Sequence, residues 1–220
     1  MLRAPPAAFA LIAASFTASN PAMAQAANVH WDVMGGYSDT LGTTANYLQG
    51  GYIFGVGLSM SPSWMHNLDL RFDVSYDVHN ATIALLNSGQ QATNQPIDFG
   101  SGSILSGSVN LVYHVPIAYG VRAYALAGAG AYYTRIELDQ ALPFFGGCGY
   151  YGCGYGFGYG DGYGEAVVAA HGVTNFGWDA GVGVEFALPY GHSWFLEARY
   201  QHVNSTATIQ YLPIEVGYRF

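Results

Sequence analysis

The chain has 220 residues, of which 51% are hydrophobic and only 9% charged, against about 25% charged residues in ordinary soluble domains. Fourteen acidic residues face six basic ones, and the resulting formal net charge of −8 argues against a nucleic-acid partner, whose phosphates require a basic surface. This fraction of charged residues is too low to solvate the surface of an ordinary soluble domain.

The N-terminal segment has the pattern of a secretory signal peptide. Arg3 precedes an apolar run at 7–16, and a small-x-small site follows at 22–24. The apolar run is shorter than the ~18 residues that a spanning helix needs, which disfavours an uncleaved membrane anchor. We therefore expect residues 1–24 to be cleaved from a mature domain of residues 25–220.

Eight segments alternate between apolar and small or polar residues with a period of two, the pattern of strands whose two faces meet different surroundings. The clearest is 68–78, where every second residue is apolar or aromatic and those between are Asp, Arg or Ser. The pattern is weaker in 31–37, and 121–133 is so rich in Ala and Gly that its facing stays open. In chain order the expected strands are 31–37, 52–60, 68–78, 105–115, 121–133, 176–186, 194–200 and 212–220.

The connections between these strands fall into two groups. Three are short and contain Pro or Gly, at 61–67, 116–120 and 189–192. The others are polar or Gly-rich, and the longer two exceed what compact soluble domains usually contain. We expect these to be extracellular loops, at about 39–46, 79–103, 136–172 and 204–206.

Strong alternation without any long apolar helix after residue 24 is typical of a transmembrane β-barrel. Only helices or closed barrels satisfy every backbone hydrogen bond inside a bilayer. An even number of strands also returns both chain ends to the same side. The expected fold is all-β: an eight-stranded antiparallel transmembrane β-barrel with long extracellular loops. A soluble β-sandwich is the alternative fold.

The last strand has the sequence LPIEVGYRF and ends on an aromatic residue. Its outward row ends with Val216, Tyr218 and Phe220, and it resembles the terminal signal that the barrel-assembly machinery of bacterial outer membranes reads. With SVNLVYHV (108–115) and NFGWDAGVGVEFAL (175–188), the chain resembles the family of small outer-membrane β-barrel proteins, porin-like or opacity-type. FLEARYQHV (195–203) belongs to the same set of matching stretches.

The resemblance implies a location in the outer membrane of a Gram-negative bacterium, among lipid and lipopolysaccharide. The expected role is non-enzymatic, structural or in surface interaction. A small passive channel is one alternative. A lipid A-modifying enzyme is a second, but Ser205 follows His202 by three residues and so points to the opposite face of a continuing strand. We expect no cofactor, no metal site and no catalytic residues.

Charged residues recur on the polar faces of the expected strands, where they would point into the lumen. Because buried charges must pair and form hydrogen bonds, we expect a salt-bridge network that plugs a narrow barrel. The alternative is an ion or proton path through the lumen. The candidates are Asp69, Arg71, Asp73, Asp179, Glu185, Glu197, Arg199, Glu215 and Arg219, with Asp77 and Arg122 as further members.

A Gly/Tyr-rich segment at 146–164 contains the only two cysteines. Secreted proteins favour disulfides over free thiols, so Cys148 and Cys153 are candidates for a disulfide. Tyr and Gly also make adaptable contact surfaces, and the segment could bind an extracellular ligand or a host surface. A flexible insertion without a partner remains the alternative.

Overall fold

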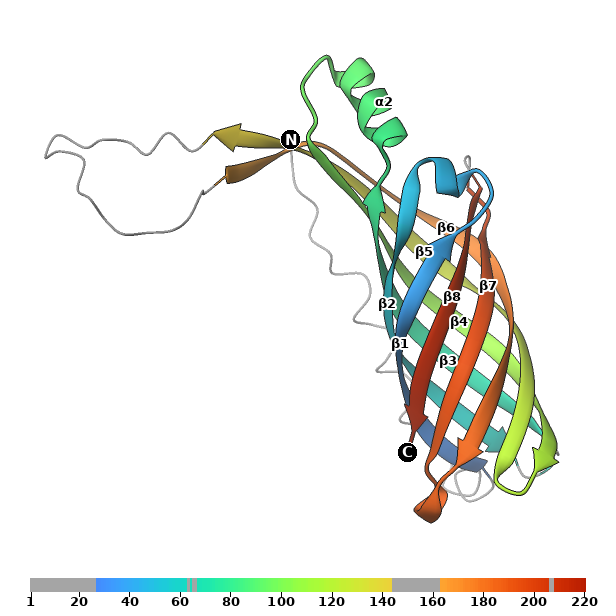
Figure 1. Ribbon diagram of the computed structural model, residues 1–220. Helices are drawn as coiled ribbons and strands as arrows, with labels where there is room; N and C mark the ends of the chain where they lie inside the picture. The colour runs from blue at the N-terminus through green and yellow to red at the C-terminus, as the bar shows by residue number, and fades with distance from the viewer. Residues whose placement is uncertain (1–26, 63, 65–66, 144–162, 206–207) are drawn as a thin grey trace, which may run out of the picture.

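The computed structural model describes residues 27–62, 64, 67–143, 163–205 and 208–220. The expected signal peptide, Cys148, Cys153 and most of the Gly/Tyr-rich segment lie outside the described residues. Eight antiparallel strands form a closed ring in sequence order, and β1 pairs with β8 to close it (Figure 1). This confirms the expected all-β, eight-stranded barrel. The strands are β1 (Ala27–Thr40), β2 (Leu48–Pro62), β3 (Leu68–Ala81), β4 (Phe99–Ala118), β5 (Val121–Pro143), β6 (Tyr163–Ala187), β7 (Ser193–Val203) and β8 (Ile209–Arg219).

Side chains alternate across the barrel wall. In β3, Val74 and Tyr76 are exposed on the outside, whereas Asp73, Ser75 and Asp77 are buried in the lumen. An apolar outside around a polar inside is the arrangement of a barrel that stands in lipid. In the Ala- and Gly-rich strand β5, Tyr124, Leu126 and Tyr132 are buried in the lumen, whereas Ala125, Ala127 and Ala129 are exposed on the outside.

The two ends of the barrel differ. At one end, which we call the short-turn end, β4 and β5 are joined through Tyr119 and Gly120, and the positive φ of 73° at Gly120 suits a residue without a Cβ. The 3-10 helix η2 (Pro189–Gly191) joins β6 to β7 at the same end. At the opposite end, which we call the wide end, the strands run past their expected limits.

The expected loops 79–103 and 136–172 are therefore shorter than the sequence predicts. β3 continues to Ala81, β4 begins at Phe99, and β5 and β6 remain paired as far as Pro143 and Tyr163. Apolar alternation fades in these extensions because a strand beyond the bilayer has no lipid face, although its backbone pairing persists.

Helix α2 (Ile83–Thr93) lies within the expected polar loop and was not anticipated. Thr82 caps its start by accepting a hydrogen bond from the backbone N–H of Leu85, and Asn94 ends it in the left-handed conformation. The 3-10 helix η1 (Thr44–Asn46) joins β1 to β2 beside it. In the described parts of the chain, no helix is long and apolar enough to cross a membrane.

The β5–β6 hairpin extends furthest from the barrel. Its outer part projects to one side beyond the barrel wall (Figure 1). β7 ends at Val203, opposite Gly177 of β6. Within the described residues, β6 therefore pairs only with β5 between Tyr163 and Asn175.

Candidate functional site

The middle of the lumen holds a cluster of four fully buried charges on β3 and β7. Arg71 donates from Nε to Oδ2 of Asp73 at 3.0 Å and from Nη2 to Oε1 of Glu197 at 2.8 Å. Arg199 lies on the same two carboxylates, with Nη1 3.1 Å from Oδ2 of Asp73 and Nε 2.9 Å from Oε1 of Glu197. Two guanidinium groups and two carboxylates thus neutralise each other, as buried charges require.

Neutral side chains complete the hydrogen bonds of this central cluster. Tyr124 donates its hydroxyl to Oε2 of Glu197 at 2.8 Å, and Asn110 donates from Nδ2 to Oδ2 of Asp73 at 2.9 Å. Because each carboxylate accepts from several donors, the cluster is tied to β3, β4, β5 and β7 at once.

A second cluster lies in the lumen near the short-turn end. Arg219 of β8 donates from Nε to Oδ1 of Asp32 at 2.7 Å and from Nη2 to Oδ2 at 3.1 Å, a two-pronged contact across the β1–β8 seam. Ser59 donates to the same Oδ2 at 2.6 Å. Nη1 of Arg219 also reaches Oε2 of Glu185 at 3.3 Å.

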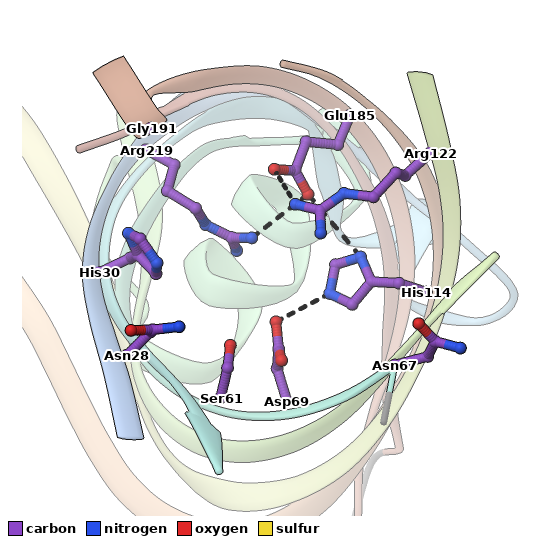
Figure 2. A pocket seen from close by; sticks show the side chains of 10 residues that line it. All are labelled: Asn28, His30, Ser61, Asn67, Asp69, His114, Arg122, Glu185, Gly191 and Arg219. Carbon is purple, nitrogen blue, oxygen red and sulfur yellow. Dashed lines mark hydrogen bonds and ion pairs between the residues drawn. The ribbon is translucent and has the colours of Figure 1, made fainter. Parts of the chain in front are cut away.

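Glu185 and His114 continue this cluster around the ring (Figure 2). Arg122 donates from Nη2 to Oε1 of Glu185 at 2.7 Å, and its side chain is about half exposed toward the opening. Nε2 of His114 lies 2.9 Å from Oδ2 of Asp69. The cluster lines a cavity of about 270 Å³ that opens at the short-turn end.

An apolar layer separates the two clusters. It consists of the buried side chains Met34, Val112, Tyr124, Leu126 and Phe195. The ring of Phe195 occupies the space in front of Gly217 on the neighbouring strand, where a Cβ atom would collide with it. Tyr124 of this layer touches both clusters, because its hydroxyl donates to Glu197 and the centroid of its ring lies 5.6 Å from that of His114.

The upper lumen, toward the wide end, is acidic. Asp77, Asp179 and Glu215 are buried there, and no ion pair to an arginine side chain joins any of the three within the described residues. Tyr132 donates its hydroxyl to Oδ2 of Asp179 at 3.3 Å. Above them, a second apolar layer is formed by Ile104, Tyr132, Val203 and Tyr211, with Ile209 packed against it.

All nine residues of the expected lumenal network point into the lumen and are buried. Seven of them lie in the two clusters: Asp69, Arg71, Asp73, Glu185, Glu197, Arg199 and Arg219. Asp179 and Glu215 lie in the acidic upper lumen instead. Asp32, Ser59 and Tyr124 were not among the residues predicted from the sequence. The inward direction of Asp32 was predictable, because it lies between the outward residues Trp31 and Val33.

The sequence candidates near the ends of β7 and β8 lie outside the lumen. Val216 and Phe220 are exposed on the outer face of β8, and the ring of Tyr218 packs edge-on against Phe220 with centroids 5.2 Å apart. The ring of His202 stacks on Trp178 at 5.4 Å, and Ser205 follows the end of β7. Among the described residues, no three His, Cys, Asp or Glu side chains are grouped as a metal site would need.

A second cavity of about 700 Å³ opens at the wide end. Its walls come from the β1–β2 and β7–β8 connections, α2, and the strands β2, β5, β6 and β8. None of the side chains that line it is Asp, Glu, Lys or Arg: they are Thr43, Thr44, Tyr47, Leu48, Leu85, Thr134, Ile136, His171, Val173, Asn175, Ser205, Thr208 and Ile209.

Comparison with known proteins agrees with this architecture. Residues 8–220 match the family model described as the outer membrane protein beta-barrel domain. Among solved structures, Neisserial surface protein A is similar with a TM-score of 0.51 and 14% identity over 88% of this chain and 97% of that one. The attachment invasion locus protein Ail of Yersinia pestis gives a TM-score of 0.44 and 14% identity over 87% and 98%. No curated protein sequence matches the chain. At these identities the structural similarity shows the fold alone.

Proposed function

Because this chain belongs to the family of outer-membrane proteins with a β-barrel domain, and so to the outer membrane of a Gram-negative bacterium, we propose that it is a closed, non-enzymatic barrel that works through its extracellular end. Its outward apolar rows contact membrane lipid and the acyl chains of lipopolysaccharide. The function therefore depends on whether ions or solutes cross the lumen and on which surfaces the two ends of the barrel expose to partners.

The observation that carries the proposal is the filling of the lumen. Two ion-pair clusters and two apolar layers follow one another along the barrel axis. An ion that crossed would have to displace Arg71 and Arg199 from their carboxylates, which costs several kcal/mol for buried pairs. It would also have to pass Phe195, which fills the lumen against Gly217. A passive channel is therefore the less favoured function.

The wide end is the end that we assign to the cell exterior, because barrels of this class have short periplasmic turns. It presents α2, the β5–β6 hairpin and the uncharged cavity. The Gly/Tyr-rich residues between β5 and β6 belong to this end by sequence, and with Cys148 and Cys153 as a disulfide they would form a constrained contact loop.

Lipid A modification is not supported by the position of His202. A base must touch its nucleophile, and the His202 ring stacks on Trp178, while Ser205 follows the strand end. On the same outer surface, we retain the outward row Val216, Tyr218 and Phe220 as the contact for the barrel-assembly machinery.

Replacement of residues 144–162 by a short Gly/Ser linker tests the proposed surface role in cells. We expect the barrel to assemble normally, as judged by a folded gel band that shifts on boiling, while adhesion to surfaces and between cells falls. Unchanged adhesion would remove this segment from the function. Altered lipid A in cells that carry the intact protein, compared with a null strain, would contradict the non-enzymatic role.

A further inference from the structure

Among the described residues, no strand pairs with the edge of β6 that faces β7 beyond the barrel rim. The last backbone hydrogen bond on that side runs from the N–H of Asn204 to the carbonyl of Phe176 at 2.9 Å. In an antiparallel strand, the N–H and C=O of one residue point to the same side, and alternate residues share that side. Ala170, Gly172 and Thr174 therefore direct their backbone groups to the free edge.

The pairing on the opposite side of the hairpin supports this assignment. The N–H of Asp98 donates to the carbonyl of Asp139 at 3.0 Å, so Asp139 faces β4 rather than β6. Alternate residues of β5 down to Tyr133 then also face β4, and Tyr133 lies opposite Thr174. In the described part of the chain, three N–H and three C=O groups of Ala170, Gly172 and Thr174 thus have no strand partner.

This free edge, which we call the edge slot (Ala170–Thr174), has defined limits. At its inner end, Asn204 already occupies the carbonyl of Phe176. At its outer end, the β5–β6 register shifts between Leu138 and Asp139, which leaves Val168 as an extra residue and bends the strand. The edge slot accommodates about five residues of an added strand.

The uncharged cavity lies on the inner side of the same edge. His171, Val173 and Asn175 line it from β6, and Leu48 and Ile209 are among the residues that line it from other strands. Alternate side chains of a strand that is added to the edge slot would point toward this cavity. In strand addition, main-chain hydrogen bonds supply affinity and such cavities select the side chains.

We infer that an extended segment of another protein adds to β6 as a strand and places uncharged apolar side chains in the cavity. The inference rests on the proposed function, because it requires the wide end to be extracellular. No described Asp, Glu, Lys or Arg lines the cavity, so acidic or basic residues at the inward positions would lose solvation without a carboxylate or guanidinium partner.

Two other occupants fit the edge slot less well. A lipid tail would fill the cavity and leave the backbone groups of the edge slot unpaired. A second copy that paired its own β6 around Gly172 would bring Val168 opposite Phe176, beyond which β7 already occupies the edge. A flexible segment can turn away from the edge at Phe176, whereas the β6 strand of a second copy is held in place by its own β5.

The test uses the full-length protein in lipid nanodiscs and a fluorescein-labelled peptide of alternating Thr and Val, seven residues long, as the probe. Fluorescence anisotropy should show saturable binding. Thr174→Pro removes one edge-facing N–H without touching the β5 pairing, and proline is tolerated on edge strands. We expect it to weaken binding roughly tenfold, as lost hydrogen bonds and a steric block predict, while the matched control Thr174→Val retains binding.

A second probe, with every Val replaced by Asp, should not bind. Equal affinity for the Thr174→Pro and Thr174→Val variants, or for the two probes, would overturn the inference. Dimers in the nanodisc that exclude the peptide would overturn it in favour of a second copy, and absence of peptide binding would overturn it outright. If only the peptide test fails, adhesion that still depends on residues 144–162 leaves the proposed function intact.

Discussion

At the scale of single residues, the lumen depends on carboxylates that each serve more than one cation. Glu197 accepts from Arg71, Arg199 and Tyr124, and its side chain is fully buried. Removal of one partner leaves part of a buried charge uncompensated, which is far more costly than loss of an exposed pair. Arg135 and Glu137 form such an exposed pair on β5.

Arg199→Leu should therefore lower the free energy of unfolding by about 3 kcal/mol, because Asp73 and Glu197 lose a shared cation inside the barrel. Urea-dependent unfolding in phospholipid vesicles, followed by the heat-sensitive gel shift, measures this change. The control Arg135→Leu removes a cation that is half exposed and should cost less than about 1 kcal/mol. Equal losses for the two variants would contradict the role of the central cluster.

At the scale of the elements, the outer face of each strand could be read from the sequence, but its pairings could not. Within the bilayer every outward residue meets lipid, so 68–78 revealed its facing through alternation alone. The facing of β5 could not be predicted in this way, because alanine suits either face. The structure determines it, since Tyr124 and Tyr132 of β5 are buried in the lumen. Beyond the bilayer the apolar row ends, which is why α2 and the long β5–β6 hairpin were read as loops.

The same limit applies to the lumenal charges. Alternation places Asp32 and Arg219 on inner faces, but that they meet depends on the register of β1 against β8, which pairs Asp32 with Arg219. No local pattern specifies a pairing between residues 187 positions apart. The inward direction of a charge was thus predictable, whereas its partner was not.

Close packing between β7 and β8 gives a second prediction. Gly217→Ala introduces a Cβ into the space of the Phe195 ring, and overpacking of this kind costs about 1–3 kcal/mol. Gly107→Ala is the matched control, since no atom lies within 4 Å of the Cβ it would add. In the same urea unfolding experiment, Gly217→Ala should be destabilised and Gly107→Ala should not. A stable Gly217→Ala barrel would mean that Phe195 does not fill the lumen there.

At the scale of the whole molecule, the barrel is closed. Its outer wall is apolar, and two charged clusters and two apolar layers cross its lumen. Among the described residues, the interior holds eight buried Asp and Glu side chains and three buried arginines, and the acidic side chains without an arginine or histidine partner lie toward the wide end. This excess does not open a path, because apolar layers lie on both sides of it. What remains available to partners is the extracellular end.

Single-channel recording in planar lipid bilayers tests this closure most directly. The purified full-length protein, shown to be folded by a gel band that shifts on boiling, should insert without producing stable conductance steps, because its central cluster and Phe195 block the lumen. Long-lived, uniform conductance steps from the same folded preparation, absent from boiled samples, would contradict a closed barrel and establish a channel instead.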